Sequence, residues 1–117
     1  MILISAKNRK QLEANYLENL AADDFKFNFD PRPVVKLFNP CGAQTWLITE
    51  IEPGTNSAFG LCDMGMGSPE LGYVSIDELA ALPIPFNLGI ERDIHFEADL
   101  TISEYADLAR ETGSIAA

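Results

Sequence analysis

Five short runs of β-branched and aromatic residues, separated by short breaks, most constrain how this chain can fold. The runs cover residues 34–38, 45–51, 57–64, 71–75 and 92–98. The first three breaks, "NPCGAQ", "EPGTN" and "GMGSPE", carry Gly, Pro or Asn and are too short for the helix that joins parallel strands. The pattern therefore predicts a mostly antiparallel sheet of about five strands, built from hairpins.

Three helices are expected around this sheet. Leucine and tyrosine recur at helical spacing over residues 6–20, after Ser5 as a potential cap. Ser75 and Thr101 each precede a glutamate by three residues, which is the capping-box pattern, and Gly113 stands where the last helix would end.

This element order predicts a single α+β domain with its helices on one face of the sheet or at its end. The domain spans residues 1–117, with the N-terminal helix in 1–22 and the sheet core and C-terminal helix in 33–110. The segment "LPIPFNLGIE" is expected to be a loop pinned by Ile84, Phe86 and Leu88.

Composition restricts the functional classes. The chain carries 18 acidic and 8 basic residues, and from residue 50 onward 13 acids stand against 2 bases. Such a charge repels phosphate backbones, so duplex nucleic acid is a poor ligand; the charge either attracts a basic protein partner or serves only solubility. We expect a cytoplasmic protein with free thiols and no membrane segment, because no secretory leader, metal-type cysteine spacing or long apolar stretch occurs.

The glycine-rich stretch "CDMGMGSPELGYVS" supports two interpretations. Its glycines and Pro69 suit a hairpin turn that needs no ligand. Alternatively, Met64 and Met66 expose adaptable apolar surface on a loop held by two strands. Asp63 and Glu70 flank the turn and would face each other in a symmetric register, where they could share a proton or bind a hard cation.

The segment "IERDIHFE" contains the sole histidine. With strand alternation, Glu91, Asp93, His95 and Glu97 would share one face, where an imidazole beside carboxylates could serve as a general base or metal ligand. The alternative is a solvent-facing side of a strand whose Ile94 and Phe96 pack inward. Nucleophilic catalysis would require Cys41 or Cys62 near His95.

Three segments, "PVVKLFNPCGAQTWLITEIEP", "FGLCDMGMGSPELGYVSIDEL" and "IERDIHFEADLTISEYA", resemble a small domain family of unknown function that is common on bacterial plasmids, conjugative elements and phage-related islands. The resemblance covers about residues 33–108. It implies accessory roles such as anti-defence or regulatory binding, and no assigned reaction. The matching positions are Lys36, Asn39, Trp46, Glu50, Asp63, Gly65, Gly67, Pro69, Glu70, Gly72, Tyr73, Glu91, Arg92, Asp93 and His95.

The leading hypothesis is a cofactor-free acidic module that docks on a basic partner, and it requires the acids of the C-terminal half to form one outward patch framed by the glycine-rich turn. Trp46 and Tyr73 are candidate aromatic anchors, unless they pack in the core. The proposed binding surface comprises Trp46, Asp63, Met64, Met66, Glu70, Tyr73 and Glu91.

Two alternatives stay open. A divalent-metal hydrolase or nuclease-like enzyme would use Asp63, Glu70 and His95 in catalysis, with Glu91 and Asp93 as further metal ligands. A single-strand nucleic-acid binder would instead use the basic start of the first helix and an aromatic run, which comprise Lys7, Arg9, Lys10, Phe25, Phe27 and Phe29.

Overall fold

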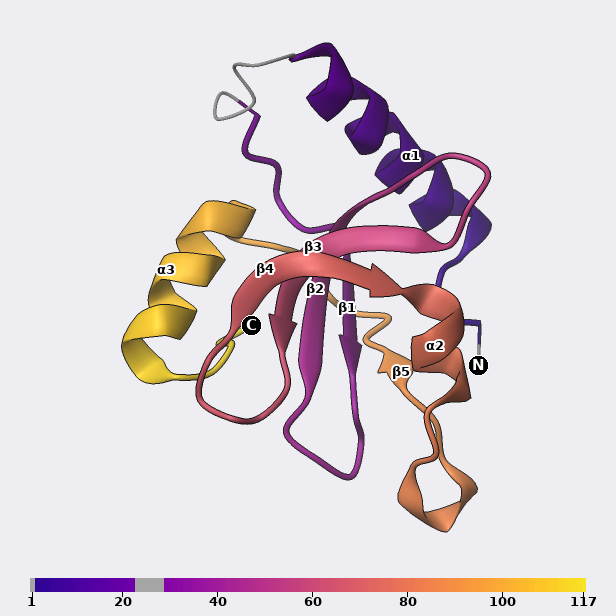
Figure 1. Ribbon diagram of the computed structural model, residues 1–117, viewed down its shortest axis with the longest axis vertical. Coiled ribbons are helices and arrows are strands. Elements are labelled where there is room, and N and C mark those ends of the chain that lie inside the picture. The colour runs from indigo at the N-terminus through magenta and orange to yellow at the C-terminus, as the bar shows by residue number, and fades with distance from the viewer. Residues whose placement is uncertain (1, 23–28) are drawn as a thin grey trace.

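A computed structural model describes residues 2–22 and 29–117, and it shows a five-stranded antiparallel sheet flanked by three α-helices (Figure 1). The strand order is β4-β3-β2-β1-β5. The predicted fold class is therefore confirmed. In chain order the elements are α1 (Ala6–Ala21), β1 (Val35–Phe38), β2 (Thr45–Ile51), β3 (Ser57–Asp63), β4 (Glu70–Ser75), α2 (Ile76–Ala81), the 3-10 turn η2 (Pro85–Asn87), β5 (Glu91–Arg92) and α3 (Ile102–Thr112).

The helices cover both faces of the sheet, so the expectation that they lie on one face or at the end of the sheet is wrong. The reason lies in β2, where every residue from Trp46 to Ile51 is buried, and alternate side chains of a strand point to opposite faces. Trp46 and Ile48 pack into one core cluster with α1 and α2, whereas Leu47 packs into another with α3. In Figure 1, β4 lies in front of the other strands, with α3 on one side of the sheet and α1 and α2 on the other.

The basic first turn of α1 has a structural use. Ser5 caps this helix by accepting a hydrogen bond from the Asn8 amide at 3.1 Å. Arg9 donates to the Thr55 carbonyl at 3.0 Å and also to the Asn56 side chain. The guanidinium therefore ties α1 to the hairpin between β2 and β3.

The ends of α3 follow the sequence prediction. Thr101 and Glu104 form a reciprocal capping box, and Gly113 ends the helix in the left-handed conformation at φ 84°. The Asp30 carboxylate accepts the Ser103 amide at 3.0 Å and the Thr101 hydroxyl at 2.8 Å. Partial burial opposes ionisation of Asp30, but these donors outweigh it and hold its pKa below the ordinary value. The segment before β1 is thereby fastened to α3.

The last strand is much shorter than predicted. It ends at Arg92, because the Asp93 carboxylate accepts the His95 amide at 3.0 Å and the Asp93 carbonyl accepts the Phe96 amide at 3.2 Å, which closes a turn. The expected alternation beyond residue 92 is therefore wrong. Phe96 packs against the α3 core cluster as expected, but Ile94 is 68% exposed.

The proline-rich loop ends in a projecting tip. Phe86 and Asn87 both have positive φ, 64° and 58°, and the Leu88 amide donates to the Pro85 carbonyl at 3.3 Å. This is the geometry of a type I′ turn. Ile84 packs against the core, but Phe86 is 89% exposed, so the prediction that it pins the loop is wrong.

Candidate binding surface around Tyr73

Two aromatic residues form the centre of the candidate surface. Phe59 on β3 lies directly opposite Tyr73 on β4, so both side chains point to the α3 face of the sheet. Tyr73 is 78% exposed although β4 is enriched in apolar residues. An exposed aromatic ring on an outer strand is typical of a binding surface rather than of a core.

A register shift in β2 brings a carboxylate beside these rings. The pairing with β3 shifts between Ile48 and Glu50, which sets Glu50 opposite Phe59. On the partner strand, Gly60 pairs with Ile48, and a Cβ there would overlap the Leu47 carbonyl. Glycine at position 60 is therefore required by the close approach of the two backbones.

Three adjacent hollows surround Phe59 and Tyr73. Their volumes are about 190, 380 and 420 Å³. Phe59, Tyr73 and Glu50 each line two of them, and in the described part of the chain no Lys or Arg lines any. We call these residues the Tyr73 surface: Tyr16, Asp30, Glu50, Glu52, Asn56, Phe59, Leu71, Tyr73, Val74, Asp77 and Glu78.

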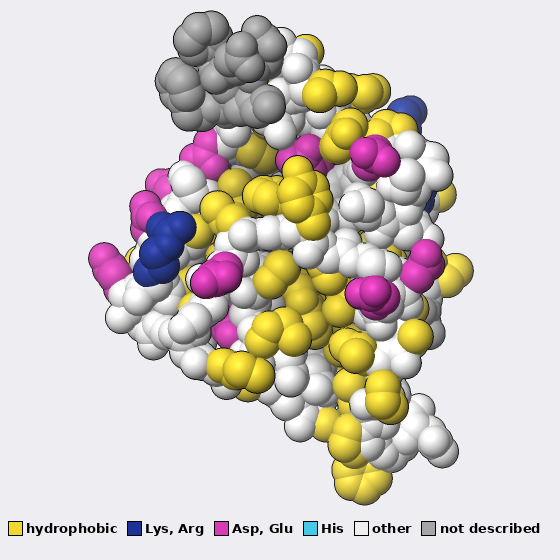
Figure 2. Space-filling model, in the orientation of Figure 1, with side chains coloured by type: hydrophobic (Ala, Val, Ile, Leu, Met, Phe, Trp, Pro, Cys, Tyr) yellow, Lys and Arg dark blue, Asp and Glu magenta, His cyan; other side chains and the backbone are white. Residues whose placement is uncertain are grey.

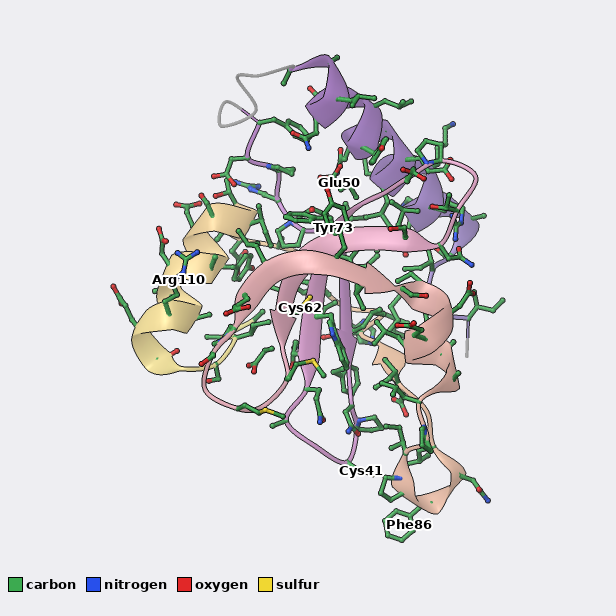
Figure 3. All side chains as sticks on the ribbon, viewed as in Figure 1. Cys41, Glu50, Cys62, Tyr73, Phe86 and Arg110 are labelled. Carbon is green, nitrogen blue, oxygen red and sulfur yellow. The ribbon has the colours of Figure 1, made fainter. Side chains whose placement is uncertain are left out.

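Figure 3 places Glu50 close to Tyr73, between α1 and the sheet. Burial raises the pKa of the Glu50 carboxyl, although the Asn19 side chain donates to it at 3.3 Å. The Tyr16 hydroxyl donates to Glu52 at 3.1 Å, and this bond is the main cause of the raised pKa of Tyr16. The charges of Glu52 and Glu50 also contribute to the raised pKa of Tyr16, which indicates negative potential beside its hydroxyl, whereas the Glu50 shift reflects burial.

The carboxylates of the Tyr73 surface are not neutralised by cations of the described chain. Among residues 2–22 and 29–117, the ion pairs join Arg9 to Glu13, Lys36 to Asp93 and Arg110 to Asp107. None involves Glu50, Glu52, Asp77 or Glu78. Figure 2 shows this side of the molecule, with separate carboxylates around apolar side chains. The arrangement suits a ligand that carries both positive charge and apolar surface.

The predicted surface residues separate into two groups. Met64, Met66, Glu70 and Tyr73 are exposed on β4 and the turn before it. Trp46 is only 1% exposed and packs in the core, so it is not an accessible anchor.

Asp63 has a structural role in the described chain. It is buried, and its two carboxylate oxygens accept the Gly65 amide at 2.8 Å and the Ile115 amide at 2.9 Å. Cys62, rather than Asp63, lies opposite Glu70, so the two carboxylates point to opposite faces of the sheet. They do not face each other as a symmetric register would require. Because Asp63 is buried and Glu91 lies beside β1, the glycine-rich turn does not frame the one acidic patch that the docking hypothesis required, and that part of the hypothesis is wrong.

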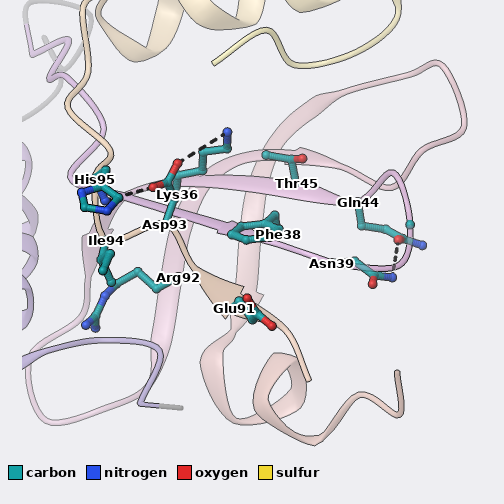
Figure 4. Close-up of a pocket in the computed structure, with 11 residues that line it drawn as sticks. Lys36, Phe38, Asn39, Gln44, Thr45, Glu91, Arg92, Asp93, Ile94 and His95 are labelled. Atoms are coloured by element: carbon teal, nitrogen blue, oxygen red, sulfur yellow. Dashed lines mark hydrogen bonds and ion pairs between the residues drawn. The ribbon is translucent and has the colours of Figure 1, made fainter. Parts of the chain in front are cut away.

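Glu91, Asp93 and His95 lie elsewhere, in a groove of about 640 Å³ beside β1 (Figure 4). Lys36 lies 3.9 Å from Asp93 across this groove, and it donates to the Ala117 carbonyl at 2.7 Å. The turn before β4 does not line the groove, because β2 and β1 separate β3 from β5. The two predicted acidic clusters therefore lie at opposite edges of the sheet.

The profile of a family described as a protein of unknown function, DUF2958, matches residues 3–116. The chain belongs to the DUF2958 family. The match includes the N-terminal helix and the residues after α3, both of which lie outside the sequence resemblance noted above. Comparison with curated proteins and with solved structures gives no match.

The DUF2958 domain does not gather the predicted metal ligands. Within the described residues, no three His, Cys, Asp or Glu side chains are placed to hold an ion together. Cys62 is half-buried and burial raises the pKa of its thiol, while Cys41 is exposed; neither lines the groove that holds His95. No helix in the described part of the chain is both long and apolar enough to span a membrane.

The nucleic-acid alternative depends on the basic start of α1, described above, and on three phenylalanines. Phe25 and Phe27 lie outside the described residues. Phe29 lines one hollow of the Tyr73 surface, alongside the carboxylates of Asp30 and Glu50.

Sequence reasoning missed several residues of the Tyr73 surface. Tyr16, Glu52, Phe59, Asp77 and Glu78 come from α1, β2, β3 and α2 and meet only in the folded chain. The one signal in the sequence is the aromatic residue at position 73, a candidate anchor in a strand next to a glycine-rich turn.

Proposed function

We propose that this DUF2958 domain is a docking module that binds a Lys- or Arg-bearing segment of a basic protein on its Tyr73 surface. The observation that carries the proposal is the exposed Tyr73 ring between hollows lined by carboxylates and, among described residues, by no cation. A cation over an aromatic face gains about 0.5–1 kcal/mol at an exposed site, and adjacent carboxylates add charge-assisted hydrogen bonds.

Long-range electrostatics supports the same partner class. The chain has a net charge of −10, so basic proteins approach it faster than neutral ones and acidic proteins are repelled. Burial of Glu50 adds a local contribution, because a bound cation offsets the cost of keeping that buried carboxylate ionised. The sequence resemblance to domains of mobile elements makes basic nucleic-acid-binding proteins, in an anti-defence or regulatory role, the first partners to test.

The hydrolase alternative has less support from the geometry. Asp63 is occupied by two backbone amides, and Glu70 points to the other face of the sheet. His95 lies in the separate groove beside β1. None of these three residues lines a hollow of the Tyr73 surface.

The test is a binding titration with a fluorescein-labelled peptide in which arginine alternates with valine. We expect saturable binding that weakens with salt, and a loss of roughly tenfold or more for Tyr73→Ala, as for a hot-spot residue. Glu111→Gln, which removes an exposed carboxylate on α3, is the matched control and should bind as the parent does. Equal binding by Tyr73→Ala, or equal binding of a peptide with citrulline in place of arginine, would overturn the proposal.

A further inference from the structure

The outer edge of β4 is open along its length in the described chain. β4 is the terminal strand of the sheet and pairs with β3 on its inner side. No backbone hydrogen bond joins Glu70–Ser75 to any described residue on the outer side. Figure 1 shows this strand nearest the viewer, and Figure 2 shows the same side with apolar side chains at its centre. In such an edge strand, alternate amides and carbonyls point outward and can form hydrogen bonds with another strand.

Little in β4 protects this edge. Natural edge strands are usually blocked by lysine, proline, a bulge or great shortness. Here six consecutive residues pair with β3 in regular register, and the only charged residue among them is Glu70 at the start. Leu71 and Tyr73 are both exposed on the α3 face. The edge therefore offers backbone hydrogen bonds and apolar contacts along one line.

Charge decides which strand can fill the edge. If β4 of a second copy paired here, Glu70, Asp77 and Glu78 of both molecules would be brought together, in addition to the net charge of −10 on each chain. A basic strand would face the same carboxylates with the opposite sign. The neighbouring carboxylates thus select a cationic segment and disfavour self-association.

We propose that the segment docked on the Tyr73 surface binds as an added β-strand along the outer edge of β4. Alternate side chains of the added strand then lie on the α3 face next to Tyr73, where a Lys or Arg contacts the Tyr73 ring and the adjoining hollow that Asp77 and Glu78 line. The intervening side chains lie on the other face, next to Val74, and are best apolar or small. The edge thus selects an extended segment in which cations occupy every second position.

This inference rests on the proposed function, so the experiment separates the two. The alternating arginine–valine peptide is compared with two analogues that are N-methylated on alternate amides, one set in each register. We expect one analogue to lose binding by tenfold or more, since half of the amides must donate to β4, and the other to bind as the parent does. A helix-forming peptide of equal charge, in which arginine is spaced among alanines, should bind more weakly than the parent.

A pair of protein variants tests the position of the added strand. Leu71→Lys places a cation on β4, whereas Leu108→Lys places the same charge at a similarly exposed position on α3. We expect Leu71→Lys alone to abolish binding of the arginine–valine peptide. Hydrogen exchange of alternate β4 amides should also slow when the parent peptide binds.

The outcomes are distinguishable. If no cationic peptide binds, the proposed function and this inference both fail. If the parent and both methylated peptides bind equally while Tyr73→Ala still weakens binding, docking stands and strand addition is refuted. If the unliganded protein dimerises and slows exchange at β4 without peptide, a second copy occupies the edge and this inference is wrong.

Discussion

Phe59 and Tyr73 meet edge to face across β3 and β4, with ring centroids 5.1 Å apart and planes inclined by 66°. The contact holds the exposed Tyr73 ring in one orientation above the hollows that flank it. Under the proposed function, partner recognition and local stability would share this residue pair.

The first prediction concerns the energy of that pair. A double-mutant cycle with Phe59→Ala and Tyr73→Ala should give a coupling of about 0.5–1.5 kcal/mol in the free energy of unfolding. Urea denaturation of the four proteins measures it. A cycle pairing Tyr73→Ala with Leu108→Ala on α3 is the control and should give no coupling. Additivity of the Phe59 and Tyr73 effects would show that the ring contact contributes nothing.

The second prediction concerns the pH dependence introduced by Glu50. Burial raises the pKa of this carboxyl in the folded protein, so the folded state holds the proton more tightly than the unfolded state. Its contribution to stability is present below the ordinary glutamate pKa of about 4.3 and is lost as the pH rises through the raised folded value. Glu50→Gln should therefore be more stable than the parent at neutral pH, and this advantage should vanish in acid.

Chemical denaturation of both proteins across that range checks the sign. The exposed Glu97→Gln variant should show no such advantage. An advantage of Glu50→Gln that grows as the pH falls would contradict the assignment.

The third prediction concerns the buried carboxylate of Asp63. Asp63→Asn replaces one acceptor oxygen by an NH₂ group that must face either the Gly65 or the Ile115 amide. Facing one of these partly buried amides with a second donor, beside a buried side chain, should cost about 1–3 kcal/mol of unfolding free energy. Exchange of the Gly65 or Ile115 amide should accelerate in the same variant. Asp99→Asn, at an exposed position, is the matched control, and equal stability of the two variants would refute the structural role.

The fourth prediction concerns the projecting tip at Phe86. Its left-handed backbone costs on the order of 1 kcal/mol for a side chain other than Gly, Asn or Asp, and the 89% exposed ring recovers little by packing. Phe86→Asn should raise the thermal midpoint, because asparagine tolerates this conformation. Phe86→Ala retains the backbone cost and should not. If Phe86→Asn lowers the midpoint, the ring has packing that the described contacts do not include.

The main elements of the fold could be predicted because local chemistry specifies them. Ser5, Thr101 and Gly113 stand at helix ends and act there as caps. The strands from β1 to β4 are bounded by turn residues, and each falls within a residue or two of its expected range. The predicted length of β5 is wrong for a local reason as well. The Asx turn at Asp93 competes with strand pairing and ends the strand.

The candidate site was predictable only in part. Tyr73, Met64 and Met66 could be named because a glycine-rich turn displays its neighbours. The structural role of Asp63 could not be predicted from the residues near it in sequence, because its hydrogen-bond partner Ile115 is distant in the chain. Glu50 joins Phe59 only through the register shift in β2, and because β2 is buried on both faces its nearly continuous apolar sequence does not reveal where the alternation breaks.

Gly60 offers a marker for comparing genomes. Because any side chain there would overlap the Leu47 carbonyl, a homologue with another residue at this position must shift β2 and β3 relative to each other. The pairing that sets the acid at position 50 opposite Phe59 would then be disturbed. A single letter of sequence should thus sort relatives into those that retain this pairing and those that do not.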